Sequence, residues 1–141
     1  MEPVDYVDTF IAVADDCPVT RGTIPPGHTS AAARAFRLIA EHPYRFTSGD
    51  VLFAIHADRH GIAPAEAEVA RRAFYARSRP CLRTSDLCRR YGWGIHADST
   101  GRIALVAVET AAYAEFVSGR RRGGSGSPTT CTEALRRSRA R

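Results

Sequence analysis

The residues best able to do chemistry lie together between positions 81 and 98. Its thiol, hydroxyl, phenol, indole, imidazole, carboxylate and guanidinium groups include those of Cys81, Arg83, Ser85, Cys88, Arg89, Arg90, Tyr91, Trp93, His96 and Asp98. Polar and aromatic groups that converge near the start of a strand often line a pocket. We therefore expect the candidate site in this stretch.

Cys81 is the best candidate nucleophile in the sequence. Arg83 follows it closely, and a short helix is predicted to begin at Thr84 or Ser85. A nearby cation and a helix N-terminus both favour the thiolate, and His96 would be the base if the later hairpin folds back beside the thiol. The structural alternative is that a cysteine between Pro80 and Leu82 is a small, partly buried hydrophobe.

The same residues could instead bind a ligand without chemistry. A guanidinium beside a helix N-terminus is suited to an anion, so the sequence predicts a pocket around Arg83, Trp93 and His96 for a small anionic ligand. Further contacts would come from Ser85, Arg90, Tyr91, Asp98 and Cys17. The alternative for Trp93, which lies between two glycines, is a core position where two backbones approach closely.

Metal binding has weaker support in the sequence. His56 and His60 are four residues apart on a predicted helix, which places both imidazoles on one face, but no third ligand accompanies them. A solvated pair at the end of the helix is therefore the favoured interpretation. A set made of Cys17, Cys81 and His96 stays open as an alternative, and the sequence predicts neither a metal nor a cofactor.

Length and composition indicate one globular domain. The chain has 141 residues, of which 44% are hydrophobic and 25% charged. No apolar run approaches the roughly 20 residues of a membrane span, so we expect no membrane partner. The N-terminus lacks the basic start and apolar stretch of a signal peptide. We therefore expect a cytoplasmic protein whose four cysteines are free thiols.

The net charge of +5 is not spread evenly along the chain. Residues 1–119 carry 13 Arg against 14 acidic residues, whereas residues 120–141 carry 7 Arg against one Glu. The basic segment is rich in Arg, Gly and Ser, and we predict that it is a disordered tail. It lacks aromatic residues for base stacking, so we expect at most weak, non-specific contact with nucleic acid.

The pattern of apolar residues predicts an α+β domain over residues 1–119. The expected elements are a strand from Tyr6 to Ala14, helices starting near Thr29, Thr47, Pro64, Ser85 and Thr110, and a β-hairpin of residues 94–98 and 102–108. The N-terminal strand and the hairpin would form a small antiparallel sheet packed with four to five helices. The second hairpin strand is apolar on both faces, which favours a central position in that sheet.

Several short motifs resemble those of a family of small bacterial proteins called domain of unknown function 6157. They are Asp8-Thr9-Phe10-Ile11, Asp16-Cys17-Pro18-Val19, Pro80-Cys81-Leu82-Arg83, the block from Arg90 to Asp98, and Gly101 with Ala104-Leu105. The resemblance covers roughly residues 4–118. It implies that Cys17, Cys81 and the Tyr-Gly-Trp-Gly-Ile-His block belong to the family pattern, whereas His56, His60, Cys88 and the tail do not.

The resemblance carries no activity, cofactor or catalytic residue, so function is inferred from the residues alone. The first hypothesis is a small binding or interaction module with the anionic-ligand pocket described above. The alternative is a thiol-dependent enzyme that uses Cys81 as nucleophile, His96 as base, and Arg83 or the helix N-terminus to hold an oxyanion.

Overall fold

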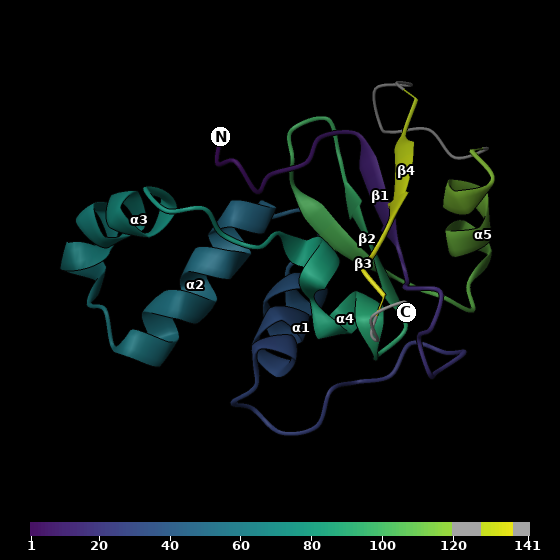
Figure 1. Ribbon diagram of the computed structural model, residues 1–141, viewed down its shortest axis with the longest axis horizontal. Coiled ribbons are helices and arrows are strands. Elements are labelled where there is room, and N and C mark those ends of the chain that lie inside the picture. Colours follow the sequence, from purple (N-terminus) through teal and green to yellow (C-terminus); the bar gives the residue numbers. More distant parts are fainter. Residues whose placement is uncertain (120–127, 137–141) are drawn as a thin grey trace.

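A four-stranded sheet lies at the centre of the computed structural model, which describes residues 1–119 and 128–136. The strands are β1 (Thr9–Ala12), β2 (Trp93–Ala97), β3 (Ile103–Ala107) and β4 (Thr130–Glu133), in the order β3-β2-β1-β4. β1 pairs antiparallel with β2, and β2 antiparallel with β3, whereas β4 runs parallel to β1. Figure 1 shows β1 between β2 and β4. The predicted antiparallel core of the sheet is confirmed, and a fourth strand makes the whole sheet mixed.

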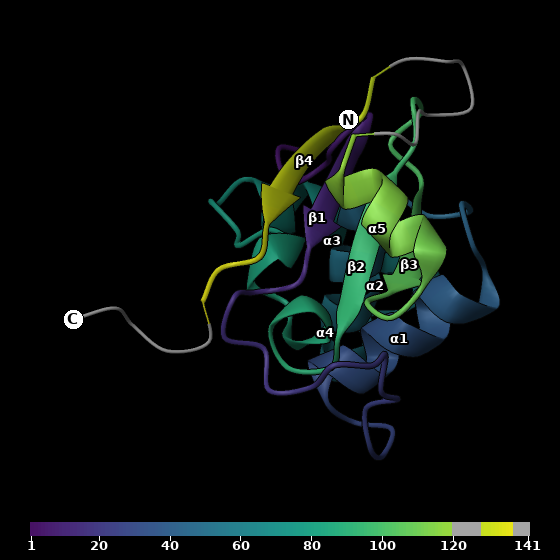
Figure 2. The same ribbon diagram turned by 90° about the vertical axis from the view of Figure 1, so that its right-hand side faces the viewer.

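Helices cover both faces of this sheet. α1 (Ala31–Glu41), α2 (Ser48–His60) and α4 (Asp86–Arg89) lie on one side, with α3 (Ala67–Tyr75) packed outside α2, and α5 (Ala111–Val117) lies on the other side (Figures 1 and 2). Two 3-10 turns, η1 (Pro64–Glu66) and η2 (Leu82–Thr84), precede α3 and α4. The described residues thus form five α-helices and a sheet, which confirms the α+β class.

Capping residues set the helix boundaries largely where the sequence predicts them. Ser30 and Ser85 accept backbone N–H groups at the starts of α1 and α4, and Thr110 does so at the start of α5. Thr47 and Asp50 form a reciprocal capping box at the start of α2, which ends at a left-handed Gly61. These caps satisfy backbone donors that the first helical turn leaves unpaired.

Strand alternation divides the core into two parts. On the side of α1, α2 and α4, Ile11, Ile95 and Ile103 pack against helix residues that include Ile39, Val51 and Leu87. On the α5 side, Phe10 stacks on Phe116 with ring centroids 4.7 Å apart and meets Tyr113 edge to face at 5.2 Å. Successive residues of β1 therefore point into different cores, because side chains alternate across a strand.

The prediction that the second hairpin strand is central is wrong. That strand is β3, which lies at the edge of the sheet. Its apolar character is explained by cover on both faces, since Ile103 and Leu105 lie in or against the helix-side core and Val106 packs against the α5-side core. The loop between α1 and α2 pairs with the start of this edge, where Tyr44 N–H donates to Ile103 O and Ile103 N–H donates to Phe46 O.

The prediction of a disordered tail over residues 120–141 fails for residues 128–136. Residues 130–133 form β4, and Ala134 after it is buried. Thr130, Cys131 and Thr132 suit an extended backbone, and the open edge of β1 supplies the hydrogen-bonding groups that composition alone does not reveal. Residues 120–127 and 137–141, with most of the arginines of this segment, lie outside the described residues.

The α5-side core depends on a glycine at position 94. A Cβ atom there would lie 2.5 Å from Phe10 Cζ and 3.0 Å from Tyr113 Cε2. We expect Gly94→Ala to lower the free energy of unfolding by about 1–3 kcal/mol, because the stacked rings must shift. Chemical denaturation followed by the fluorescence of Trp93 measures this loss. The exposed control Val69→Ala should stay within about 0.5 kcal/mol of the wild type, and equal stability of both variants would contradict the packing argument.

Candidate functional site

Cys81 lies on the helical side of the sheet, immediately before η2. Its sulfur is half-buried and lies 3.1 Å from the hydroxyl of Tyr6. Leu82 beside it is buried in the helix-side core, which fixes the backbone at this point. The thiol lines two hollows, one of about 520 Å³ towards α1 and α2, and one of about 460 Å³ towards the segment after α3.

His96 lies on the opposite side of the sheet from Cys81. Its ring is buried under α5 at a centroid distance of 4.4 Å from Phe116, and its Nδ1 is 2.8 Å from the hydroxyl of Tyr44. The structure therefore does not bring Cys81 and His96 together as nucleophile and base. The sheet also separates His96 from Cys81 in the alternative metal set of Cys17, Cys81 and His96.

The expected pocket around Arg83, Trp93 and His96 is not formed by these three side chains. Arg83 Nε donates to Glu133 O at the β4 edge of the sheet. Trp93 Nε1 donates to Thr23 O, and its ring packs against Phe36 on the helical side. The three side chains thus point to three different parts of the molecule. The alternative of a core role fits Trp93 better.

Four other predicted contact residues have structural roles. Arg90 pairs with Asp86 one helical turn away, Tyr91 packs against the helix-side core, and half-buried Cys17 donates its backbone N–H to Ala14 O. Asp98 closes the β2–β3 turn by accepting from the N–H groups of Thr100 and Arg102. Burial opposes ionisation of Asp98, but these hydrogen bonds outweigh it and lower its pKa.

Ser85 is the predicted contact residue that shares a cavity with Cys81. This hollow, which we call the Cys81 cavity, lies between α1, α2 and the η2–α4 segment. Its apolar lining comes from Ala31, Ala32, Ala35, Leu52, Ile55 and Leu82, and its polar lining from Ser30, Arg59, Cys81, Thr84, Ser85, Asp86 and Arg89. An apolar floor with a few convergent polar groups is the usual composition of a small-molecule site.

Two serine hydroxyls in the Cys81 cavity are arranged as donors. Ser30 Oγ accepts from Ala33 N–H, and Ser85 Oγ accepts from Leu87 N–H. Each oxygen uses a lone pair in its helix cap, so its own proton is directed elsewhere. Thr84 differs because its hydroxyl donates to Cys81 O, which leaves its oxygen as an acceptor. The cavity therefore offers hydroxyl donors mainly from the two cap serines.

The cationic groups of the Cys81 cavity come from two elements. Arg59 lies in the last turn of α2, and among the described residues it has no hydrogen-bond or ion-pair partner. Arg89 lies on α4 and donates to Arg136 O. The first turn of α1, which also borders the cavity, contains no acidic residue to offset its positive dipole end. These features favour an anion over a cation, although Asp86 also faces the cavity.

The structure does not support the predicted anion site at the start of the short helix, which is α4. α4 has four residues, and the Ser85 side chain already caps Leu87 N–H. Arg59 and Ser30, which face the cavity from α2 and α1, are not among the predicted site residues. The sequence marks Thr29 or Ser30 as a helix cap and not as a site residue, and no local signal marks Arg59 as a neighbour of Cys81.

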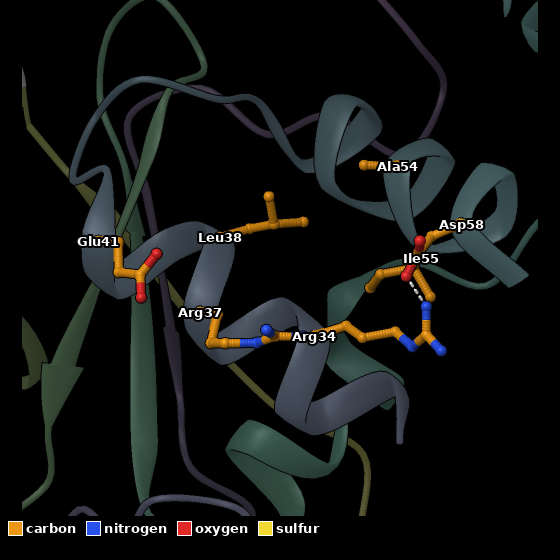
Figure 3. Close-up of a pocket in the computed structure, with 7 residues that line it drawn as sticks. All are labelled: Arg34, Arg37, Leu38, Glu41, Ala54, Ile55 and Asp58. Carbon is orange, nitrogen blue, oxygen red and sulfur yellow. Dashed lines mark ion pairs between the residues drawn. The ribbon is translucent and has the colours of Figure 1, made fainter. Parts of the chain in front are cut away.

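A second hollow of about 310 Å³ lies between α1 and α2 (Figure 3), and Ile55 lines both this hollow and the Cys81 cavity. Its charged groups are largely used within the protein. Arg34 forms an ion pair with Asp58 and donates to Thr29 O, and Arg37 donates to His28 O. Figure 3 shows Arg34 extended across the hollow to Asp58. This hollow therefore has fewer groups available for a ligand.

His56 and His60 lie together on α2, as their spacing predicts. Their ring centroids are 4.4 Å apart, and His56 also packs on Phe74 at 4.5 Å. Burial, followed by the neighbouring His60 and Arg79, lowers the pKa of His56. Residues 1–119 and 128–136 contain no group of three or more His, Cys, Asp or Glu side chains placed to hold a metal ion.

Within the same described ranges, no helix combines the length and the apolar character needed to cross a membrane.

Comparison with known protein families gives a match over residues 1–122 to a family described as a family of unknown function, DUF6157. The chain belongs to the DUF6157 family. The match contains β1, β2 and β3, the five described α-helices and every residue that lines the Cys81 cavity. Comparison with curated proteins and with solved structures gives no match.

Membership in DUF6157 confirms the resemblance seen in the sequence and assigns no chemistry. The match ends before β4, so the family region of this chain leaves one edge of β1 without a neighbouring strand. The fourth strand is thus contributed by residues outside the family match.

The four thiols differ in burial, and we expect their reactivity to follow it. Burial raises the pKa of the fully buried Cys88 thiol well above its ordinary range, whereas Cys17 and Cys81 are half-buried and Cys131 is exposed. Burial, followed by the charge of Glu133, also raises the pKa of Cys131, although this residue is exposed. Iodoacetamide at pH 8 should modify Cys131 first because its thiol is the most accessible of the four, and Cys88 only after unfolding because its thiol is buried and the thiolate is the reacting form. Mass spectrometry of timed digests measures each rate. Modification of Cys88 as fast as Cys131 in the folded protein would contradict this order.

Alkaline titration provides a second measurement near Cys81. Burial, followed by the hydrogen bond and charge of Cys81, raises the pKa of Tyr6 to about 12. An unfolded tyrosine ionises near pH 10, so this contribution to stability is present below pH 10 and is lost as the pH rises towards 12. In denaturant titrations between pH 10 and 12, the free energy of unfolding of the Tyr6→Phe variant should fall less steeply with pH than that of the wild type. An unchanged slope would contradict the assignment.

Proposed function

We propose that this protein is a small binding module whose ligand occupies the Cys81 cavity and carries a phosphate or carboxylate group. The observation that supports this most is the composition of the cavity: about 520 Å³ with an apolar floor, two arginines and two cap serines with hydroxyl protons to donate. The proposal keeps a small anionic ligand and moves its site from Arg83, Trp93 and His96 to Cys81, Ser85, Arg59 and Arg89.

The apolar part of the cavity lining narrows the expected ligand from any anion to an organic anion. Leu52, Ile55 and Leu82 contribute aliphatic surface to the lining of the cavity. A free inorganic anion would leave this surface in water, whereas an organic anion buries it and gains roughly 25 cal/mol for each Å² of apolar area covered. An organic phosphate or carboxylate with a hydrocarbon or ring portion therefore fits the cavity best.

The geometry gives less support to a thiol enzyme. The hydroxyl of Tyr6 is the side-chain group hydrogen-bonded to Cys81, and its pKa of about 12 means that it stays a phenol at neutral pH. A phenol that holds its proton does not act as a general base for a thiol. Since His96 lies across the sheet, the alternative lacks the base it needs.

The four free thiols support a reducing compartment, and we propose the cytoplasm of a bacterial cell as the site of action. Weak contact with nucleic acid through the arginines of residues 120–141 stays a secondary proposal. It rests on the composition of that segment and predicts a binding that weakens steeply with salt.

A thermal-shift screen of organic phosphates and carboxylates on the full-length protein tests the proposal. A ligand at a hundred times its dissociation constant should add about 2.7 kcal/mol to the free energy of unfolding. Arg59→Gln should weaken the binding of any ligand found by about tenfold or more, because it removes a charge-assisted hydrogen bond worth roughly 1.5–3 kcal/mol.

Arg102→Gln is the matched control, since this arginine is exposed at the start of β3 and does not line the cavity. Its ligand affinity should equal that of the wild type. A screen in which no compound stabilises the wild type, or in which both variants lose affinity equally, would contradict binding in the Cys81 cavity.

A further inference from the structure

The segment that includes β4 is held almost entirely through its backbone. Thr130 N–H donates to Asp8 O at one end of the pairing with β1, and Ala134 N–H donates to Ala12 O at the other. The side chains of Thr130, Cys131 and Glu133 are exposed. Contacts of this kind recognise an extended chain with little regard to most of its side chains.

The opposite side of the segment is held by Arg83 and Arg89. Arg83 uses both its main chain and its side chain, because its carbonyl accepts from Leu135 N–H at 2.9 Å and its Nε donates to Glu133 O at 2.7 Å. Arg89 donates from its guanidinium to Arg136 O at 3.0 Å. The chain thus lies between the edge of β1 and the η2–α4 segment, a trough that we call the β1 groove.

One side chain of the segment enters the protein. Ala134 is 5% exposed and belongs to the helix-side core cluster, whereas Leu135 beside it is 46% exposed. The β1 groove therefore selects a small residue at one position and accepts varied residues at the others. At the start of the segment the fit is incomplete, since Thr129 Oγ1 and Asp8 Oδ1 are buried without a hydrogen-bond partner among the described residues.

We propose that the β1 groove is a docking site for an extended peptide, which residues 129–136 occupy from within the same chain. Two observations carry this inference: the groove lies wholly in the DUF6157 match of residues 1–122, and its occupant lies wholly outside it. The partner is a peptide strand that runs parallel to β1 and places alanine or a similarly small residue at the position of Ala134. This site differs from the Cys81 cavity, although Arg89 borders both.

A competition experiment on the full-length protein tests the proposal. The probe is a fluorescent peptide with the sequence of residues 128–136 and serine at the position of Cys131, and its binding is followed by anisotropy. The Ala134→Arg chain cannot bury its own segment, so we expect it to bind the probe at least tenfold more tightly than the wild type, whose tethered segment competes at high effective concentration. The Glu133→Gln chain is the control and should bind like the wild type, because its side chain is exposed.

Two further results decide the proposal. A probe that itself carries Ala134→Arg should not bind, and Arg83→Ala in the Ala134→Arg chain should weaken the normal probe. A folded Ala134→Arg chain that takes up no probe, or that binds it no better than the wild type, overturns the proposal. A wild-type dimer held through residues 128–136, with no uptake of free probe, also overturns it in favour of strand exchange between copies.

Hydrogen exchange on the wild type gives an independent test if the Ala134→Arg chain does not fold. Excess unlabelled peptide should speed exchange at the amides of Thr130 and Ala134, because their chain is displaced, and leave those of β2 unchanged. Unchanged exchange at Thr130 and Ala134 under saturating peptide overturns the proposal.

Discussion

The structure depends on β1 and β2 being covered on both faces. Phe10 and Ile11 are neighbours in sequence and both are almost fully buried, yet they pack into different cores. Helices α1, α2 and α4 must therefore lie on one side and α5 on the other, and the chain between them has to pass around the sheet. Because a strand alternates its side chains, the side of every residue on β2 follows from the register of its pairing with β1.

This constraint decides what the Gly-Trp-Gly-Ile-His block can do. Trp93 and Ile95 point to the helical side, whereas position 94 and His96 face the α5 side, where Phe10 and Tyr113 leave no room for a larger residue at position 94. His96 is thus committed to packing and to a hydrogen bond with Tyr44. Cys81 is held on the helical side by the burial of Leu82, so the residues near it are those of α1, α2 and α4, together with Tyr6 and the segment after α3.

Local signals in the sequence are sufficient for the helices and for β1 to β3, and insufficient for β4 and for the site. Thr47, Gly61 and Thr110 mark helix ends through backbone requirements that act within a few residues, and the structure has those ends. The approach of Arg59 and Ser30 to Cys81 depends on how three helices pack, and no periodicity encodes that. The separation of Cys81 from His96 needed the pairing register and the place of η2, neither of which a single sequence reveals. β4 was missed because its partner strand, and not its composition, stabilises it.

The two edges of the sheet are protected in different ways, and the difference bears on function. The β3 edge is paired at its start with the loop of residues 44–47, which lies in the family region between α1 and α2. The β1 edge is covered by residues outside that region, through backbone hydrogen bonds and one small side chain. An exposed edge is a hazard for aggregation, so it must be covered in each folded chain. The strand that covers the β1 edge makes few side-chain contacts and comes from outside the family region. Another extended strand can therefore replace it with the loss of few specific contacts. The β1 edge is therefore the surface of this fold best suited to pairing with another chain.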